Sequence, residues 1–258
     1  MPIVKPSNTT APVFYPAENY TLAKYLDIAK FLSLIQTNSL FFCRMDRFED
    51  KYEGSLPEKN KEHYKLWTAS ILENLIPDQK VTIEELEKKL LSYLEMSEKF
   101  KTLNCISCWN KMRNESYALW KIYSNMNQGI MIKSSVERLT NAFSKTNEDI
   151  QISEVKYIDH KVDIIEPGNM NFPIIHKNKA YHYEEEIRLI HQVKFKHGLK
   201  YDWNKEPNPN GKNFKIDISE LIDEVIISPF AEKWFYDIVA DIMKVYKIDK
   251  KLKMSEFS

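Results

Sequence analysis

Residues 178–193 carry the acidic and basic side chains best suited to chemistry. Their spacing predicts a strand over residues 183–192, whose side chains alternate between two faces. Glu184, Glu186 and Arg188 then share one face, so two carboxylates and a guanidinium point the same way. Three adjacent acids are poor strand formers, so tertiary packing must place them, which is typical of a functional site. A charged edge strand or a purely structural arginine–glutamate pair would give the same pattern.

A second charged group follows a predicted buried strand. Arg44 closes that strand, and Asp46, Asp50 and Glu53 follow it in a charged loop. Loops held by a rigid scaffold commonly display reactive groups. A guanidinium such as that of Arg44 pairs with two phosphate oxygens at once, which a lysine cannot do. These residues are therefore candidates for binding a ligand beside the acidic strand.

The middle of the chain adds hydroxyl and aromatic groups. Ser107 and Trp109 lie on a predicted strand, and a helix is predicted over residues 115–126. Trp120 and Tyr123 are three residues apart on this helix and share a face. Aromatic residues at such spacing usually belong to a core, but they would also stack on a planar ring beside an acidic site.

The apolar pattern predicts a single domain of class α+β, with a mixed, mainly antiparallel central sheet, flanking helices and a helical insertion. Predicted strands cover residues 40–44, 103–109, 129–134, 152–158, 183–192, 214–218 and 225–228. Predicted helices cover residues 22–38 and 115–126, a segment after residue 135, and residues 231–246. Residues 1–19 carry four prolines and are expected to form an extended arm before the domain at residues 20–258, with the charged helical stretch at residues 58–102 as the insertion.

Composition limits the classes of function. The 37 basic and 37 acidic residues cancel, so net charge does not indicate a nucleic-acid partner, although a local basic groove would still allow one. No run approaches about 18 apolar residues and the first residues lack a secretory pattern, so we expect a cytoplasmic protein with no membrane partner. The chain has five glycines and no Walker or dinucleotide-binding glycine motif, so a nucleotide would be held in another way.

No metal site is expected from the cysteines or histidines. Cys105 and Cys108 have the spacing of a redox or metal pair, but their strand-like surroundings lack turn residues, which predicts buried thiols. The histidines form no pair at the spacing of four residues that metal-binding helices use.

Short motifs recur in a fixed order along residues 22–230. They are Lys24-Tyr25-Leu26, Leu40-Phe41-Phe42-Cys43-Arg44, Arg47-Phe48-Glu49-Asp50, Glu53-Gly54, Ser107-Cys108-Trp109, Glu115-Ser116, Leu119-Trp120-Lys121-Ile122-Tyr123, Gly129-Ile130 and Tyr183-Glu184-Glu185-Glu186-Ile187-Arg188-Leu189-Ile190. In order and spacing they resemble the bacterial family called domain of unknown function 2971. That family name implies no activity.

The order of these elements also resembles the layout of ADP-ribosyltransferases, in which an early Arg or His and a middle Ser or Tyr hold NAD while a late glutamate acts on the ribose. The resemblance implies that Arg44 contacts the NAD phosphates and that Ser107 supports the nicotinamide side. It also implies that Glu186 is the catalytic carboxylate, with Glu184 as a second acid. The sequence departs from the layout because Ile106-Ser107-Cys108 replaces the usual Ser-Thr-Ser pattern and because Arg188 is not part of the signature.

The chemistry that this resemblance implies can be stated for the residues present. Breaking the nicotinamide–ribose bond develops positive charge on the sugar, which a carboxylate such as Glu186 stabilises where water is excluded. Trp120 or Tyr123 would sandwich the departing ring. NAD is then a co-substrate and no metal is expected. The acceptor macromolecule stays open, as does a role as a toxin or phage-defence protein.

Two other hypotheses account for the same residues. A metal-dependent nuclease would use Asp46, Asp50, Glu53, Glu184 and Glu186 to hold Mg²⁺, but the lysine of the usual nuclease signature is missing. A non-catalytic module that binds a ligand or a partner would use the arginines and carboxylates as a buried ionic network that organises the sheet.

Overall fold

The fold is built on a sheet in the computed structural model, which describes residues 3–4, 13–50, 52–63, 66, 83–166, 171–193 and 208–257. The strands are β1 (Thr21–Asp27), β2 (Ser39–Arg44), β3 (Asn104–Lys111), β4 (Gly129–Ser135), β5 (Gln151–Glu154), β6 (Lys156–Ile158), β7 (His176–Asn178), β8 (Glu186–Gln192), β9 (Gly211–Lys215), β10 (Glu224–Ile227) and β11 (Lys251–Met254). The α-helices are α1 (Ile28–Thr37), α3 (Ile83–Lys101), α4 (Tyr117–Tyr123), α5 (Val136–Ala142), α6 (Ile218–Leu221) and α7 (Lys233–Val245). Short 3₁₀ helices are η1 (Met45–Arg47), η2 (Met126–Gln128), η3 (Phe172–Ile175) and η4 (Lys179–Glu184).

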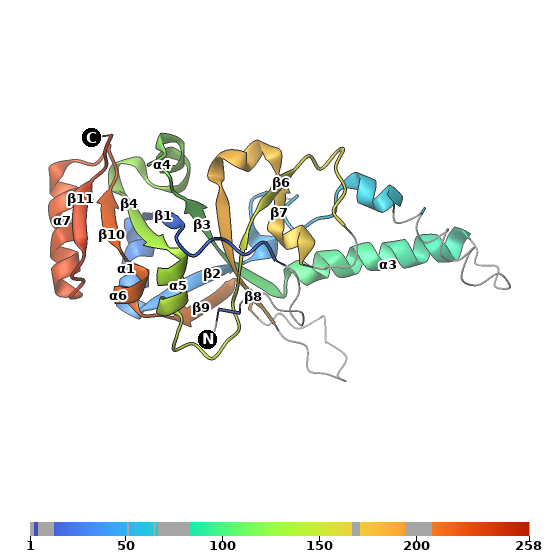
Figure 1. Cartoon of the computed structure of the whole chain (residues 1–258), viewed down its shortest axis with the longest axis horizontal. Coiled ribbons are helices and arrows are strands. Elements are labelled where there is room, and N and C mark those ends of the chain that lie inside the picture. Colours follow the sequence, from blue (N-terminus) through green and yellow to red (C-terminus); the bar gives the residue numbers. More distant parts are fainter. Residues whose placement is uncertain are drawn as a thin grey trace.

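Nine of the described strands form one sheet (Figure 1). Their order is β11-β10-β4-β1-β3-β2-β9, and β8 joins through β3 and carries β5 on its other edge. All pairings in this sheet are antiparallel except that of β10 with β11. The predicted α+β class with a mixed, mainly antiparallel sheet and flanking helices is therefore confirmed.

The sheet forks at β3. One edge of β3 pairs with β8 from Asn104 to Asn110. The opposite edge is shared, because β1 pairs only with Asn110 and Lys111 while β2 pairs only with Cys105 and Ile106. The stretch of β3 at residues 107–109 has no register partner in either strand, so β1 and β2 separate there and leave a gap in the sheet.

The two faces of the sheet are covered differently. One face carries the main apolar core, in which α1, α5 and α7 pack on the strands. The other face carries two smaller apolar clusters. One of them joins Tyr25 to Trp120 of α4, and the other joins Ile106 and Ile190 to η1, α3 and η3. The fork and the start of β8 lie between these two clusters.

The predicted helix over residues 22–38 is wrong in its first part, which is strand β1. Because β1 is buried on both faces, its apolar residues do not alternate and imitate a helical pattern. The helix begins after Asp27, whose side chain accepts a hydrogen bond of 2.7 Å from the Lys30 amide. It ends at Asn38, which adopts a left-handed conformation.

Several further boundaries differ from the sequence prediction. The strand predicted over residues 152–158 is two strands, β5 and β6, and the strand predicted over residues 214–218 is β9, which ends at Lys215. The strand expected from residue 183 begins only at Glu186, and α4 is capped by Ser116 and ends at Tyr123. Strand β11 was not expected, because its lysines and short length give little strand signal.

Part of the predicted insertion at residues 58–102 lies outside the described residues, and within it α3 projects from one end of the sheet (Figure 1). The division into an arm and one domain remains a prediction. Within the predicted arm, Ile3 forms an isolated β-bridge with Ile150.

Candidate functional site

The two candidate acids are placed by a turn rather than by one continuous strand. Residues Lys179–Glu184 form the 3₁₀ helix η4, and Glu185 then adopts a left-handed conformation with φ of 41°. Glu186 begins β8, where its backbone N–H donates to the Tyr157 hydroxyl at 2.8 Å. The turn therefore changes the chain direction between the acids, yet both carboxylates reach the same place.

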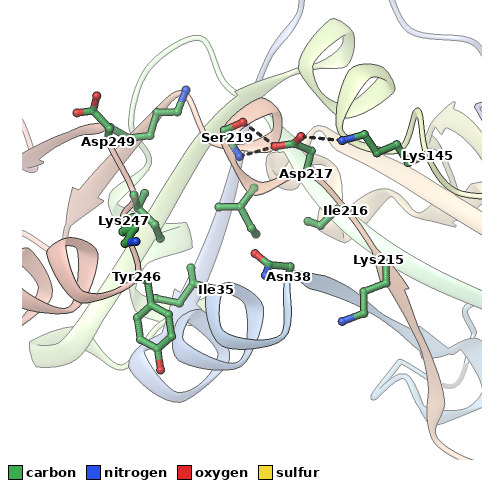
Figure 2. Close-up of a pocket in the computed structure, with 13 residues that line it drawn as sticks. Ile35, Asn38, Lys145, Lys215, Ile216, Asp217, Ser219, Tyr246, Lys247 and Asp249 are labelled. Carbon is green, nitrogen blue, oxygen red and sulfur yellow. Dashed lines mark hydrogen bonds and ion pairs between the residues drawn. The ribbon is translucent and has the colours of Figure 1, made fainter.

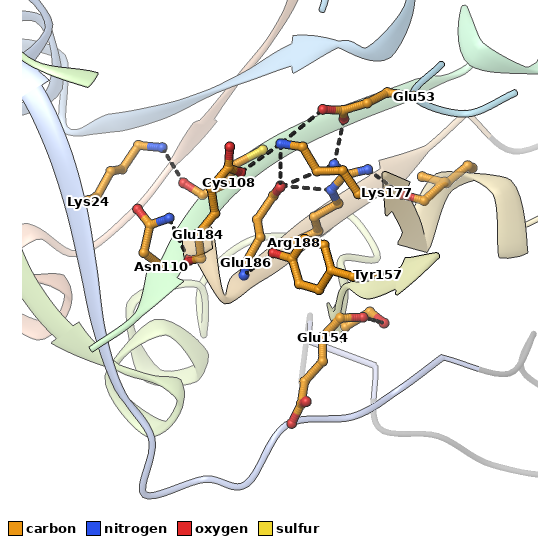
Figure 3. Close-up of polar contacts among 12 residues, drawn as sticks. Lys24, Glu53, Cys108, Asn110, Glu154, Tyr157, Lys177, Glu184, Glu186 and Arg188 are labelled. Atoms are coloured by element: carbon orange, nitrogen blue, oxygen red, sulfur yellow. Dashed lines mark hydrogen bonds and ion pairs between the residues drawn. The ribbon is translucent and has the colours of Figure 1, made fainter. Parts of the chain in front are cut away.

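Lys177 on β7 joins the acids (Figure 3). Its Nζ lies 2.6 Å from Glu184 Oε2, 3.1 Å from Glu186 Oε2 and 3.0 Å from Glu53 Oε1. All four side chains are buried. One ammonium group thus holds three carboxylates that come from separate segments of the chain.

Arg188 on β8 completes the ionic network. Its Nε donates to Glu186 Oε1 at 2.7 Å, its Nη2 donates to Glu53 Oε2, and its Nη1 donates to the Ile174 carbonyl. The register places Arg188 opposite Cys108 and Glu186 opposite Asn110, all on the same face of the sheet. Buried charges need such complete pairing, because an unpaired one would cost several kcal/mol.

The network separates the pKa values of the two acids. Burial alone would raise the pKa of Glu186, but Arg188 and Lys177 outweigh it and lower that pKa to about 2. Burial raises the pKa of Glu184, and hydrogen bonds from Lys177 and Tyr123 only partly oppose this. Glu186 is therefore ionised at neutral pH, whereas Glu184 takes up a proton more readily than an ordinary glutamate. A carboxylate pair of this kind can divide acid–base roles.

Tyr123 ties helix α4 to the acids. Its hydroxyl donates to Glu184 Oε1 at 2.6 Å. Burial and this carboxylate together raise the pKa of Tyr123, so the hydroxyl keeps its proton and remains a donor.

These groups line a cavity of about 350 Å³ beside the fork in the sheet. Its lining residues are Lys24, Tyr25, Arg47, Phe48, Glu49, Asp50, Glu53, Cys108, Asn110, Tyr123, Lys177, Tyr181, Glu184 and Glu186. The floor comes from β1, β3 and β8, and one wall comes from the loop after β2. The volume is at the lower end of the range for small-molecule sites.

Lys24 lies in the gap of the fork. Its Nζ donates to the Cys108 carbonyl at 2.8 Å and to Ser107 Oγ at 3.3 Å, and it lies 5.5 Å from the centre of the Trp109 ring. Burial lowers the pKa of Lys24, and among the described residues no carboxylate forms an ion pair with it. Lys177 is bound by three acids, whereas the contacts of Lys24 within the described part of the chain are to a carbonyl, a hydroxyl and an aromatic ring.

The cysteine in the cavity wall is not a reactive thiolate. Burial raises the pKa of Cys108 well above its ordinary range, and Glu186 adds to this effect. The three cysteines are free; the predicted burial holds for Cys105, whereas Cys108 is partly exposed.

The structure brings together six of the ten candidate site residues. Glu184, Glu186, Asp50, Glu53 and Tyr123 line the cavity. Arg188 lies beneath it and contacts two of its acids.

The other four residues lie elsewhere. Arg44 pairs in register with Cys105, so it points to the opposite face from Arg188 and is bound to Asp46. Trp109 is fully buried in the main core, and Trp120 is fully buried behind Tyr25. Ser107 is also absent from the cavity lining but accepts a hydrogen bond from Lys24.

Lys177, Lys24 and Arg47 are site residues that the sequence did not single out. Lys177 lies at the end of a long predicted loop, and loops of that length are often functional, but no local pattern marks the lysine itself. Arg47 is exposed, lines the cavity and lies three residues beyond Arg44, which does not line it.

A larger hollow of about 720 Å³ lies between α1, α6 and the segment after α7 (Figure 2). It contains none of the candidate residues. Among the described residues, no three His, Cys, Asp or Glu side chains are grouped to hold a metal ion. Within the same residues, no helix is both long and apolar enough to span a membrane.

Comparison with known proteins gives a family model and a similar solved structure. The model of the family described as a protein of unknown function (DUF2971) matches residues 119–189, which confirms the resemblance for that part of the chain. The matched part includes Tyr123, Lys177, both candidate acids and Arg188. A search of curated proteins found no match.

The solved structure of Thermus sp. 2.9 DarT in complex with carba-NAD+ is similar over 94% of this chain and 98% of that chain. The TM-score is 0.37 and the sequence identity is 8%.

Proposed function

We propose that this chain binds NAD in the cavity and breaks the bond between nicotinamide and ribose, as an ADP-ribosyltransferase or an NAD glycohydrolase. The observation that carries the proposal is the buried pair of Glu184 and Glu186, whose pKa values move in opposite directions within one cavity. A buried acid that stays ionised is suited to stabilise positive charge, and its neighbour is suited to exchange a proton.

Glu186 is the residue that we assign to the ribose. Its negative charge is fixed by Arg188 and Lys177, so it needs no reorganisation when positive charge develops on the sugar. Glu184 is assigned to the proton of the acceptor or of water, since its raised pKa makes it a better base than an ordinary glutamate.

The rest of the cavity offers groups suited to the nicotinamide ring and to the phosphates of NAD. Tyr25, Phe48 and Tyr181 offer aromatic rings beside the acids, and this combination attracts a cationic planar ring such as nicotinamide. Lys24 and Arg47 offer positive charge to phosphate oxygens. In this assignment Arg47 takes the role that the sequence resemblance gave to Arg44.

A non-catalytic binding module is the second candidate, and one observation favours it. Both oxygens of Glu186 already accept hydrogen bonds, Oε1 from Arg188 and Oε2 from Lys177 and Arg188. A ribose hydroxyl must then share an occupied carboxylate. Binding of NAD without turnover would support this candidate.

The test compares nicotinamide release from NAD by the wild type, Glu186→Gln and Glu185→Gln. Loss of a preorganised charge commonly costs about 10²- to 10³-fold in rate, so we expect at least that loss for Glu186→Gln. Glu185→Gln is the matched control, because Glu185 is the neighbouring acid and does not line this cavity. Circular dichroism of each variant checks that the fold is retained.

The outcomes separate the two candidates. Wild-type turnover in Glu186→Gln contradicts the catalytic assignment. A wild type that is stabilised against heat by carba-NAD+ but releases no nicotinamide is a binding module. A role as a toxin or in phage defence remains a prediction, and so does the identity of the acceptor.

A further inference from the structure

Glu115 is a buried acid outside the cavity that joins two distant parts of the chain. Its Oε2 accepts from Ser255 Oγ at 2.5 Å and from Trp120 Nε1 at 3.3 Å, and its Oε1 accepts from the Glu256 amide at 3.1 Å. Its side chain is 7% exposed. One carboxylate thus fastens residues 255–256 to helix α4.

Helix α4 depends on such contacts for its position. It has seven residues, and helices of this length are not stable alone in water. The Tyr117 ring, at the start of α4, makes edge contacts with Phe230 at 5.2 Å and Phe257 at 6.3 Å. The segment after β11 therefore covers the same end of α4 that Glu115 holds.

The opposite end of α4 reaches the candidate site. Trp120 packs edge-on against Tyr25 at 4.9 Å, and Tyr25 lines the cavity. Tyr123 donates to Glu184 one turn later. A continuous set of contacts thus runs from Glu115 through Trp120 to the cavity wall, and through the helix to Tyr123 and Glu184.

We propose that Glu115 is a positioning residue, which makes residues 255–257 part of the support of the active site. It acts through α4 by holding Tyr25 against the cavity and Tyr123 on Glu184. The proposal gives Trp120 a place in the function, as a buried support instead of a surface on which the ligand stacks. Its catalytic consequence rests on the proposed function, whereas its structural consequence does not.

The structural test is hydrogen exchange of the full chain, followed by mass spectrometry of peptides from α4. In Glu115→Gln, an amide nitrogen cannot accept the bonds that the carboxylate accepts now. Bonds to charged groups are strong enough that we expect the amides at residues 116–124 to exchange about tenfold faster. Ser255→Ala should give a smaller change in the same direction. Glu256→Gln is the control, because its backbone N–H is retained and its side chain is exposed.

The catalytic test measures kcat and KM for NAD in Glu115→Gln, in Tyr123→Phe and in the double variant. We expect Glu115→Gln to lower kcat with little change in KM. In the double variant the two losses should be less than additive, because Glu115→Gln weakens the contact with Glu184 that Tyr123→Phe removes. Unchanged exchange in α4 overturns the proposal, and so does uniformly faster exchange throughout the sheet. Faster exchange confined to α4 in a protein that does not turn over NAD would support the structural part and remove only the proposed reaction.

Discussion

Arg44 and Arg188 are two buried arginines that differ in what lies beside them. Their exposures are 1% and 0%, and each is paired with an acid two residues away on the same chain. Arg44 binds Asp46, whose side chain is 27% exposed, on the face that carries the main core. Arg188 binds two fully buried glutamates beneath a cavity. Burial and pairing of an arginine therefore do not mark a site; acids that also face a cavity do.

The two arginines also differ in the segments that their contacts join. Arg44 bonds its own strand's continuation and the Asn208 carbonyl, whereas Arg188 joins β8 to Glu53 of the loop after β2 and to Ile174 of η3. Arg188 therefore organises the cavity walls, and it should contribute more to stability than Arg44.

The largest expected effect comes from replacing each arginine by methionine, which keeps much of the volume. Arg188→Met leaves Glu53 and Glu186 buried with fewer partners, which should cost about 3–5 kcal/mol of unfolding free energy. Arg44→Met should cost about 1 kcal/mol, since the partly exposed side chain of Asp46 can be solvated. Urea denaturation of both variants measures the difference. Equal losses of unfolding free energy in the two variants would contradict a larger contribution of Arg188 to stability.

The next effect is the dependence of stability on acid. The pKa of Glu186 is lowered from its ordinary value of 4.5 to about 2 in the folded chain. A lowered pKa gives stability that is present above the ordinary value and is lost as the pH falls toward 2, here on the order of 3 kcal/mol. Glu184 acts in the opposite sense, because its raised pKa favours the protonated form in the folded chain.

Thermal unfolding measured from about pH 6 to about pH 2 tests this acid dependence, because the range covers both the ordinary carboxyl pKa and the lowered pKa of Glu186. The wild type should lose stability steeply at the acidic end, and Glu186→Gln should lose less from a lower starting point. Parallel curves for the two proteins would show that Glu186 does not carry the acid sensitivity.

The smallest effect is expected for Tyr123→Phe. The change removes the hydroxyl that bonds Glu184 and should cost about 1 kcal/mol of stability, because the site is partly exposed. Since that hydroxyl lowers the pKa of Glu184, its loss should move the Glu184 limb of the pH–rate profile to higher pH. Tyr117→Phe is the matched control on the same helix. A profile that does not move would separate Glu184 from the proton transfer.

The sequence predicted the fold class and the region of the candidate site better than it predicted where single residues lie. Short apolar runs such as residues 40–44 and 103–109 are strands, because such runs bounded by turns or charges favour buried strands. Strand β1 was mistaken for helix, because a strand buried on both sides loses the alternation that identifies strands. The turn at Glu185 was missed, because nothing in three consecutive glutamates indicates a left-handed residue.

The same limit applies to the site residues. Glu184 and Glu186 were found because acids before an apolar strand conflict with local propensity. Lys177 was not found, because its role depends on where β7 lies. That strand pairs with β6 in a separate two-stranded sheet and brings Lys177 to Glu184, which the sequence pattern does not show. Arg44 was chosen because it closes a predicted strand, as the early arginine of the ADP-ribosyltransferase layout does, but the face to which a side chain points follows from register.

The fork at β3 decides which parts of the binding surface are able to vary. Most of the cavity floor belongs to central strands whose backbone is shared with the core, so substitutions there disturb folding before they alter recognition. Residues 47–50 and 53 supply a wall without belonging to the sheet. Substitutions of Arg47 or Glu49 can therefore change the surface of that wall, while the backbone of the floor stays fixed by the sheet.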